Sequence, residues 1–297
     1  MKKAAPLSAQ EVGNLLRPFT LKDTIAVAVS GGADSLALTL LLKQWAEQQE
    51  QPLKIVALTV DHQLRPESTN EAQTVHRWLT ERSIHHEILT WHHKPISSGL
   101  QQKSRQARYH LLSSWCHAHE ITTLMTAHHL HDQWETVLMR LSKGTGLTGL
   151  CGIRSVVKTG FGQLIRPLLT VDPSRLQETL IQFQQPFLQD PSNDNNAYAR
   201  VRWRRLLPIL AAEGLSPQMM HKTLLQLQGV EFFCQEQTEH AFNRCLGPDN
   251  CLNLHHLQAL PLEIACRVLK KIIRQIGQAP YESNSIKLNR LYQTLLE

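Results

Sequence analysis

The sequence predicts an α/β protein with a doubly wound parallel sheet, followed by a smaller all-helical C-terminal domain. Short apolar runs rich in β-branched residues alternate with helical patterns up to residue 143. Apolar runs of this kind are typical of strands buried on both faces, as in parallel sheets. Beyond Gly144 the alternation stops, and from Ser216 onward the chain shows helical patterns without strong strand signals. We therefore expect two domains, residues 1–215 and 216–297.

The first domain is expected to contain a repeated strand-then-helix unit. The expected strands are residues 24–29, 54–60, 84–91 and 122–127. The helices that follow them are expected at 35–49, 67–82, 101–119 and 131–143. In such sheets ligands bind at the carboxyl ends of the strands, in the loops that lead to the helices.

Weaker signals surround this core. Ser8 and Glu11 have the spacing of a capping box, which predicts a first helix that ends near Pro18. In the rest of the first domain, after residue 143, we expect a glycine-rich loop, two short extended segments and two helices. In chain order these are residues 144–152, 164–169, 173–184, 187–193 and 200–212, of which 173–184 and 200–212 are the helices.

Composition excludes several classes of protein. A chain of 297 residues with 42% hydrophobic residues can bury a core without disulfide or metal crosslinks. The net charge of +6 favours polyanionic partners only weakly. No run approaches the ~18 apolar residues of a membrane helix, the N-terminus has no signal-peptide pattern, and the six cysteines form no CxxC pair. We expect a cytoplasmic protein with reduced thiols and no membrane contact.

The loop after the first strand carries the most chemical information. Its sequence is Ser30-Gly31-Gly32-Ala33-Asp34-Ser35. Adjacent glycines let backbone amides approach an anion, and the helix that begins near Ser35 directs its positive end to the same place. Asp34 would repel phosphate unless it holds a cation, which implies Mg²⁺. The loop therefore predicts a site for a metal-bound polyphosphate.

This loop resembles the SGG-x-D-S motif of the pyrophosphate-loop (PP-loop) ATPases. The resemblance implies an adenine nucleotide alpha hydrolase-like fold, with ATP bound by Ser30, Gly31, Gly32, Ala33, Asp34 and Ser35. It also implies transfer of AMP to a substrate oxygen with release of pyrophosphate. Other phosphate motifs fail: there is no GxxxxGK[ST], and the GxGxxG match at 144–149 follows a helix instead of a strand.

Further segments resemble one branch of that family, the tRNA(Ile)-lysidine synthetases, over residues 20–210. They are VDHQLRPES at 60–68, AHHLHDQWET at 127–136, KGTGL at 143–147, RPLL at 166–169, and DPSN at 190–193 with Arg200 and Arg202. The resemblance implies three substrates: ATP, L-lysine and an isoleucine tRNA with a CAU anticodon. The wobble cytidine would be adenylated and then attacked by the lysine amine, which yields lysidine, AMP and pyrophosphate. A homodimer is plausible by base rate alone.

Asp34, His128, Asp132 and Arg200 are the expected catalytic residues. Asp132 lies four residues after His128, in the first turn of the expected helix. We assign Asp132, with Asp34, to Mg²⁺ or to the incoming amine, and His128 to phosphate contact or proton transfer. The family usually has two adjacent acids here, and His131 replaces the first of them. A zinc site built from the neighbouring histidines is not expected, because neighbours cannot all face one metal.

Basic residues form the expected surface for tRNA or phosphate. They are Arg105, Arg108, Lys143, Arg200 and Arg202. Arg105 and Arg108 lie three residues apart, on one face of a helix whose apolar face would contain Ala107, Leu111, Trp115 and Ala118. Arginine forks suit phosphate recognition, whereas Arg204 and Arg205 are interpreted as surface residues only.

Three alternatives stay open. A tRNA thiolase of the same loop family would need cysteines for sulfur or an iron–sulfur cluster, and the isolated cysteines oppose it. A small-molecule amidotransferase-like ligase would need a glutaminase nucleophile, of which the sequence shows no signature. A non-catalytic tRNA-binding relative with a decayed site is suggested by His131.

Overall fold

The computed structural model forms two compact units. Unit 1 consists of Met1–Met139 and Gly152–Pro217, and unit 2 of Arg140–Cys151 and Gln218–Glu297. The residues that the structure describes are 4–51, 53–94, 96, 98–189, 199–247, 249–277 and 285–296. The expected domain boundary after residue 215 lies two residues before the end of unit 1. Residues 140–151, which we assigned to the first domain, lie in unit 2.

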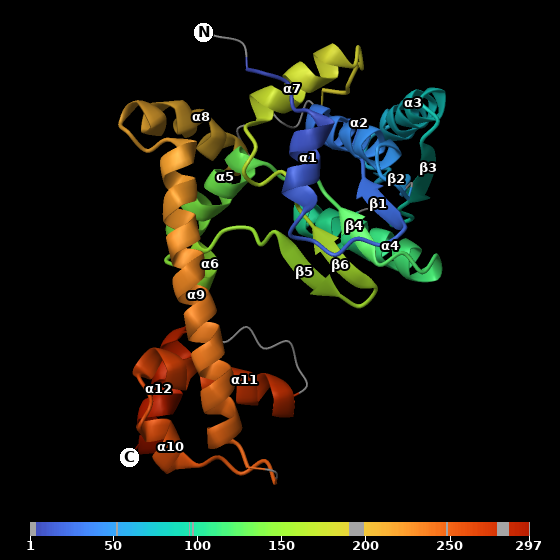
Figure 1. Ribbon diagram of the computed structural model, residues 1–297. Helices are drawn as coiled ribbons and strands as arrows, with labels where there is room; N and C mark the ends of the chain where they lie inside the picture. Colours follow the sequence, from blue (N-terminus) through green and yellow to red (C-terminus); the bar gives the residue numbers. More distant parts are fainter. Residues whose placement is uncertain are drawn as a thin grey trace. The chain divides into compact units, whose positions relative to one another are not determined.

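Unit 1 is built on one six-stranded sheet with strand order β3-β2-β1-β4-β6-β5 (Figure 1). Its strands are β1 (Thr24–Ala28), β2 (Lys54–Asp61), β3 (His85–Thr90), β4 (Thr123–Met125), β5 (Val156–Thr159) and β6 (Gly162–Ile165). Neighbouring strands are parallel except β5 and β6, which form an antiparallel pair. The predicted parallel α/β fold is therefore confirmed. The antiparallel β5 was not predicted, and the segment expected to be extended at 164–169 begins earlier, at Gly162.

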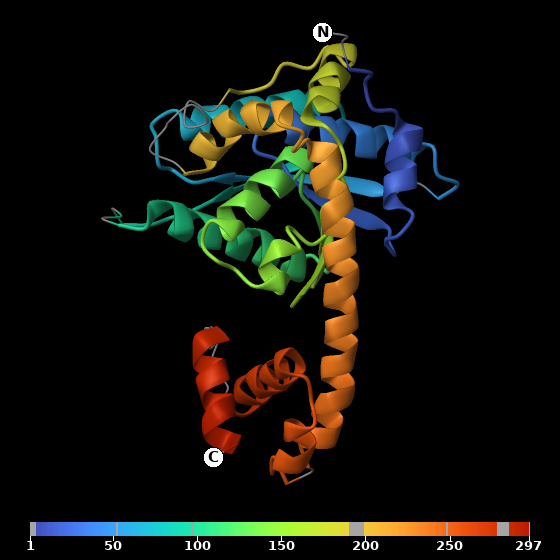
Figure 2. The same ribbon diagram turned by 90° about the vertical axis from the view of Figure 1, so that its left-hand side faces the viewer.

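Helices cover both faces of this sheet (Figure 2). The helices of this region are α1 (Ala9–Leu16), α2 (Ala33–Glu47), α3 (Ser68–Glu81), α4 (Leu100–Ala118), α5 (Leu130–Leu141), α7 (Pro173–Gln182) and α8 (Ala199–Ala212). The predicted capping box of α1 is present, since the Glu11 amide donates to Ser8 Oγ and the Ser8 amide donates to the Glu11 carboxylate.

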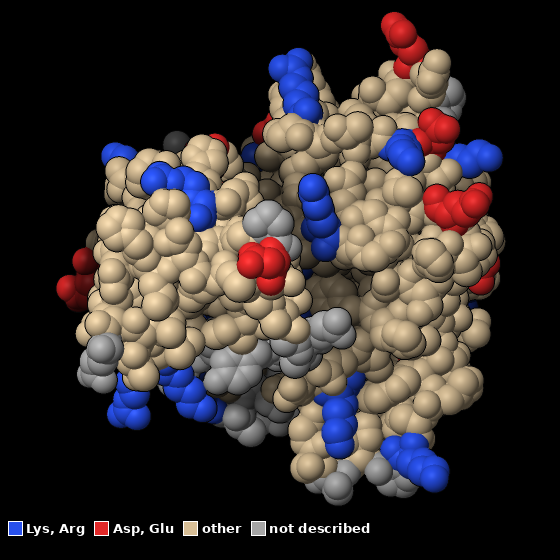
Figure 3. All heavy atoms as spheres, turned by 90° about the horizontal axis from the view of Figure 1, so that it is seen from below, with Lys and Arg blue, Asp and Glu red and all other residues tan. Residues whose placement is uncertain are grey.

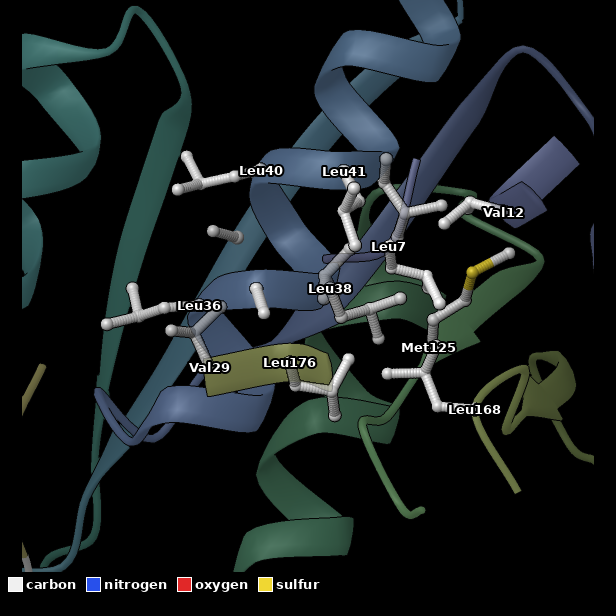
Figure 4. Close-up of a cluster of buried hydrophobic side chains, with 14 of the residues drawn as sticks. Leu7, Val12, Val29, Leu36, Leu38, Leu40, Leu41, Met125, Leu168 and Leu176 are labelled. Carbon is white, nitrogen blue, oxygen red and sulfur yellow. The ribbon is translucent and has the colours of Figure 1, made fainter. Parts of the chain in front are cut away.

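Alternating strand residues divide the core into two layers. Ile25 and Val27 of β1 pack with α1, α2, α3 and α7 on one face, where Figure 4 shows part of the cluster. Ala26 faces the other way and packs with Leu112 and Cys116 of α4. The apolar face of α4 is therefore centred on Leu112 and Cys116, and our expectation for it was wrong in detail, because Ala118 is exposed.

Unit 2 is helical. It contains α6 (Leu147–Leu150), α9 (Pro217–Cys245), α10 (Leu254–Gln258), α11 (Leu262–Gly277) and α12 (Ser285–Leu296). Its core includes Phe242, Leu257 and Leu269. Buried Glu231 of α9 accepts hydrogen bonds from Arg267 Nη2 at 2.8 Å and from Thr148 Oγ1 at 3.1 Å. These bonds attach the segment 140–151 to the C-terminal helices.

In the described part of the chain, no helix is both long enough and apolar enough to cross a membrane. Four of the six cysteines are buried as small apolar side chains, whereas Cys234 is half-buried and Cys251 is exposed.

Candidate active site

The strand order creates a topological switch point beside β1. From β1 the chain proceeds outward on one side to β2 and β3, while β4 lies on the other side of β1. In open α/β sheets ligands bind where the strand order reverses, at the carboxyl ends of the strands. The Ser30–Ser35 loop follows β1 and the segment 126–129 follows β4. The fold therefore brings together the two motifs that the sequence placed about 95 residues apart.

The Ser30–Ser35 loop is held by its own polar groups. The Ser30 amide donates to Ser35 Oγ at 3.1 Å, and Ser35 Oγ donates to the carbonyl of Gly32 at 3.0 Å. Gly32 is the N-cap of α2 and has no side chain with which to cap the helix. The positive end of α2 is thus presented at the carboxyl edge of the sheet, as an anion site requires.

Gly31 cannot be replaced without strain. Its φ is +82°, and a Cβ there would lie 2.6 Å from Leu188 Cδ1 and 2.7 Å from Val75 Cγ2. The Gly31 carbonyl also accepts a hydrogen bond from the Leu188 amide at 2.9 Å. The close packing of this turn explains the requirement for glycine in physical terms.

His129 lies between the two acids expected to bind metal. Its Nε2 lies 3.5 Å from Asp34 Oδ2 and 3.6 Å from Asp132 Oδ2, and its backbone amide donates to Asp132 Oδ2 at 3.0 Å. Burial opposes the charged ring, but the two carboxylates outweigh it and raise the pKa of His129. The pKa of Asp132 is lowered in spite of burial, through His129 and Arg200. We had assigned no role to His129.

His128 has the opposite electrostatics. Its Nδ1 lies 2.9 Å from Thr126 Oγ1. Burial lowers its pKa to about 3, and the positive charges of Arg166, Arg200 and Arg105 act in the same direction against the attraction of Asp132. A ring that is neutral at pH 7 can donate its one N–H to a phosphate oxygen but is a weak base.

Asp132 and Glu135 anchor the arginines of α8. Arg200 Nη2 lies 3.4 Å from Asp132 Oδ1, and Arg200 Nε donates to Glu135 Oε2 at 2.7 Å. Arg204 Nε donates to the other oxygen of Glu135, also at 2.7 Å, and the Glu135 side chain is fully buried. Arg204 is exposed, as expected, but it also pairs with a buried carboxylate, which we did not predict. Both acids lie on α5 with the i, i+3 spacing of one helix face, a signal that could have identified Glu135.

Further cations surround His128. Arg105 and Arg108 of α4 both lie over the ring of Tyr109, 5.0 Å and 5.4 Å from its centre. The Nε of Arg166 and the hydroxyl of Tyr109 are buried and have no hydrogen-bond partner among the described residues. Buried donors of this kind need acceptors, so this cluster is suited to an anionic ligand. Arg166 and Tyr109 were not among our expected site residues.

The remaining predicted residues lie elsewhere. Lys143 belongs to unit 2, where it is exposed in the turn after α5, and Arg202 is exposed on α8. The DPSN segment at 190–193 lies outside the described residues. His131, which replaces the expected acid, lies near Asp172, with Nε2 3.9 Å from Asp172 Oδ2.

The donor set at His129 fits magnesium better than zinc. In the described ranges, no three His, Cys, Asp or Glu side chains are grouped as a metal site. Mg²⁺ commonly takes only one or two protein carboxylates and completes its shell with water and substrate phosphates. Asp34 and Asp132 supply two carboxylates beside the Ser30–Ser35 loop.

Comparison with known proteins agrees with this geometry. A family described as the PP-loop domain matches residues 5–210. The tRNA(Ile)-lysidine synthase of Rhodopseudomonas palustris is 40% identical over 95% of this chain and 83% of its own length. The tRNA(Ile)-lysidine synthase of Bradyrhizobium sp. is 34% identical over 98% of this chain and 85% of its own length. The chain belongs to the tRNA(Ile)-lysidine synthase family.

Structural similarity extends beyond this family. The U34-tRNA thiolase NcsA from Methanococcus maripaludis superposes with a TM-score of 0.62, at 17% sequence identity, over 73% of this chain and 78% of that chain. At this identity the likeness shows a common fold alone. The matched PP-loop domain, residues 5–210, contains the loop Ser30–Ser35.

Proposed function

We propose that this chain is an ATP-dependent tRNA(Ile)-lysidine synthase, which joins L-lysine to C2 of the wobble cytidine of a CAU-anticodon tRNA(Ile). One observation carries the proposal. At the switch point of the sheet, His129 links the PP-loop acid Asp34 to Asp132 of α5, in a chain up to 40% identical over nearly its whole length to synthases of this name.

The chemistry requires activation of a poor electrophile. The C2 oxygen of cytosine is a poor leaving group, so attack of that oxygen on the α-phosphate of ATP forms an adenylate that can leave as AMP. The PP loop binds the β- and γ-phosphates through its amides and the N-terminus of α2. Asp34 and Asp132 are the residues that would hold Mg²⁺, which would supply positive charge to the phosphate oxygens.

The arginines stabilise the charge that develops during adenylation. Arg105, Arg108, Arg166 and Arg200 all act electrostatically on His128 or on one another. Fixed cations that face developing negative charge lower the barrier, because they need no reorganisation. We assign Arg105, Arg108 and Arg200 to the α-phosphate or the tRNA backbone, with neutral His128 as a hydrogen-bonding group among them.

The lysine amine must lose a proton before it attacks C2, since a free lysine side chain has a pKa of about 10.4. Glu135 is already shared by two guanidinium groups. Asp132 is paired more loosely, at 3.4 Å from Arg200. We therefore assign to Asp132 the orientation of the incoming ammonium group or the binding of Mg²⁺.

Unit 2, which includes Lys143, is proposed to bind parts of the tRNA other than the wobble base. On the face shown in Figure 3, Lys and Arg side chains are scattered singly among Asp and Glu side chains and uncharged surface. This distribution favours several separate phosphate contacts. A cytoplasmic location and a homodimer remain proposals from the sequence.

The test is incubation of the chain with CAU-anticodon tRNA(Ile), ATP, Mg²⁺ and isotopically labelled lysine, with each component omitted in turn. The proposal expects label in the wobble nucleoside by mass spectrometry, with equimolar AMP and pyrophosphate, only in the complete mixture. Sulfur incorporation without lysine would instead support a thiolase. tRNA binding without pyrophosphate release would support a non-catalytic relative.

A further inference from the structure

A chain of hydrogen bonds starts at exposed His76, passes through buried His86 and Thr59, and ends at the PP loop. Thr59 of β2 donates from Oγ1 to the carbonyl of Val29 at 2.9 Å, one residue before the loop begins. His86 of β3 lies with Nε2 2.8 Å from the same Oγ1. His76 of α3 lies with Nδ1 3.0 Å from His86 Nδ1. Thr59 and His86 are 5% and 4% exposed, so the bonds from His86 to Thr59 and from Thr59 to Val29 are shielded from water.

The direction of each bond in this chain is fixed by elimination. A carbonyl can only accept, so the single hydroxyl proton of Thr59 is used toward Val29. The Thr59 oxygen must then accept from His86, which places a proton on His86 Nε2. When His86 is neutral, its Nδ1 has only a lone pair, and His76 Nδ1 donates to it. Each group therefore donates to the next in the same direction, from α3 through β3 and β2 to the end of β1.

The last acceptor in this chain, the Val29 carbonyl, controls the geometry of the loop. The Val29 carbonyl and the Ser30 amide belong to one planar peptide group. That amide donates to Ser35 Oγ, which in turn donates to the Gly32 carbonyl. Holding the Val29 oxygen in place therefore fixes the direction of the Ser30 amide on the opposite side of the same plane. The Val29 amide is held as well, by the carbonyl of Leu58 at 2.8 Å.

We propose that Thr59 and His86 are positioning residues for the phosphate-binding loop, which act by fixing the peptide plane between Val29 and Ser30. Neither side chain is placed to touch ATP. Their effect passes through Val29 to Ser30 and Ser35, and it rests on the proposed role of this loop in ATP binding. Loss of a buried hydrogen-bond partner leaves polar atoms unsatisfied, and here the unsatisfied atoms are the Val29 carbonyl and His86 Nε2.

The test compares two substitutions, each of which removes one of the two groups on Cβ of the threonine side chain. Thr59→Val keeps the methyl group and removes the hydroxyl, whereas Thr59→Ser keeps the hydroxyl and removes the methyl. Binding of a non-hydrolysable ATP analogue in the presence of Mg²⁺ is measured by calorimetry. KM for ATP and KM for lysine are measured in the complete reaction. We expect Thr59→Val to weaken nucleotide binding about tenfold, which is about 1.4 kcal/mol, with KM for lysine unchanged. Thr59→Ser should stay within about twofold of the unsubstituted protein.

A matched control is available in α7. Thr179 is also fully buried, and its hydroxyl donates to the Arg175 carbonyl at 2.7 Å and accepts from the Leu7 amide at 2.8 Å. Thr179→Val should lower the melting temperature without changing nucleotide binding. Nucleotide binding by Thr59→Val equal to that of the unsubstituted protein, or an equal loss in Thr59→Ser, would overturn the inference.

If Thr59→Val does not fold, His86→Leu decides the question. This substitution leaves the Thr59 hydroxyl in place but removes the donor that orients it, and about threefold weaker nucleotide binding is expected from partial loss of the chain. Unchanged binding would reject the inference. If the unsubstituted protein binds the nucleotide but transfers no lysine, the proposed function fails, whereas the positioning role is still measured by the binding experiment.

Discussion

Two adjacent histidines illustrate how much depends on single residues at this site. His128 faces arginines, which with burial lower its pKa to about 3, whereas His129 faces Asp34 and Asp132, which raise its pKa. Both follow β4 within a short loop, so their sequence positions do not reveal which ring turns toward the acids. We propose that metal binding depends on this pair of carboxylates.

Asp34 provides the first prediction. Asp34→Asn keeps the shape of the side chain but removes the charge needed to hold Mg²⁺ beside the phosphates. Pyrophosphate release in the presence of tRNA should fall more than about a hundredfold, as expected when a transition-state charge contact is lost. Glu47→Gln, at the exposed end of the same helix, serves as the control and should be unaffected. Undiminished release by Asp34→Asn would remove Asp34 from the metal site.

The arginine pair on Glu135 provides the second prediction. Arg200→Ala or Arg204→Ala alone leaves the buried carboxylate with one guanidinium, but the double substitution leaves it with neither. The double variant should lose more free energy of unfolding than the two single variants together, by about 1–3 kcal/mol. Denaturant unfolding measures this coupling. Additivity within about 0.5 kcal/mol would show that the two pairs act independently.

Elements of secondary structure differed in how well the sequence predicted them. β1 and β2 were predicted because strands buried on both faces give continuous apolar runs. β5 and β6 are only four residues each, β5 lies half-buried at the edge of the sheet, and β6 is buried only at Leu164 and Ile165, so their pattern is weak. The apolar face of α4 was misplaced because the helix is buried only through its C-terminal half, at Leu112 and Cys116.

The contact between α3 and β3 predicts a pH dependence of stability. Burial lowers the pKa of His86 from 6.5 to about 4, and His76 and His85 add repulsion. Between these two values the unfolded chain binds more protons at this position than the folded chain. The stabilisation is therefore complete above pH 6.5 and is lost as the pH falls toward 4. Up to about 3 kcal/mol is at stake, at about 1.4 kcal/mol per pKa unit.

The measurement is the free energy of unfolding at pH 7 and pH 5, for the unsubstituted protein and for His86→Gln. The other buried histidines contribute equally to the pH dependence of both proteins. The difference between the two pH dependences is therefore due to His86. The pH dependence of His86→Gln should be shallower. Equal pH dependences would show that His86 does not titrate below its ordinary range.

At the scale of the whole molecule, the sequence predicted the order of the motifs and the fold that carries them. Topology then explains why distant motifs meet, since β1 and β4 are neighbours at the switch point. The sequence could not show that residues 140–151 belong to unit 2, because that depends on tertiary contacts such as Cys151 Sγ with the Leu227 carbonyl at 3.5 Å. For the same reason the roles of Arg166 and His129 were found only in three dimensions.

The central claim is that the PP loop of this chain binds the phosphates of ATP, with a metal held by Asp34 and Asp132. The most direct measurement is a crystal structure of the protein with Mg²⁺ and a non-hydrolysable ATP analogue. The account predicts the β- and γ-phosphates on the amides of Ser30–Ser35, with Mg²⁺ bridging them to at least one of these two carboxylates. A nucleotide bound elsewhere, with this loop empty, would contradict it.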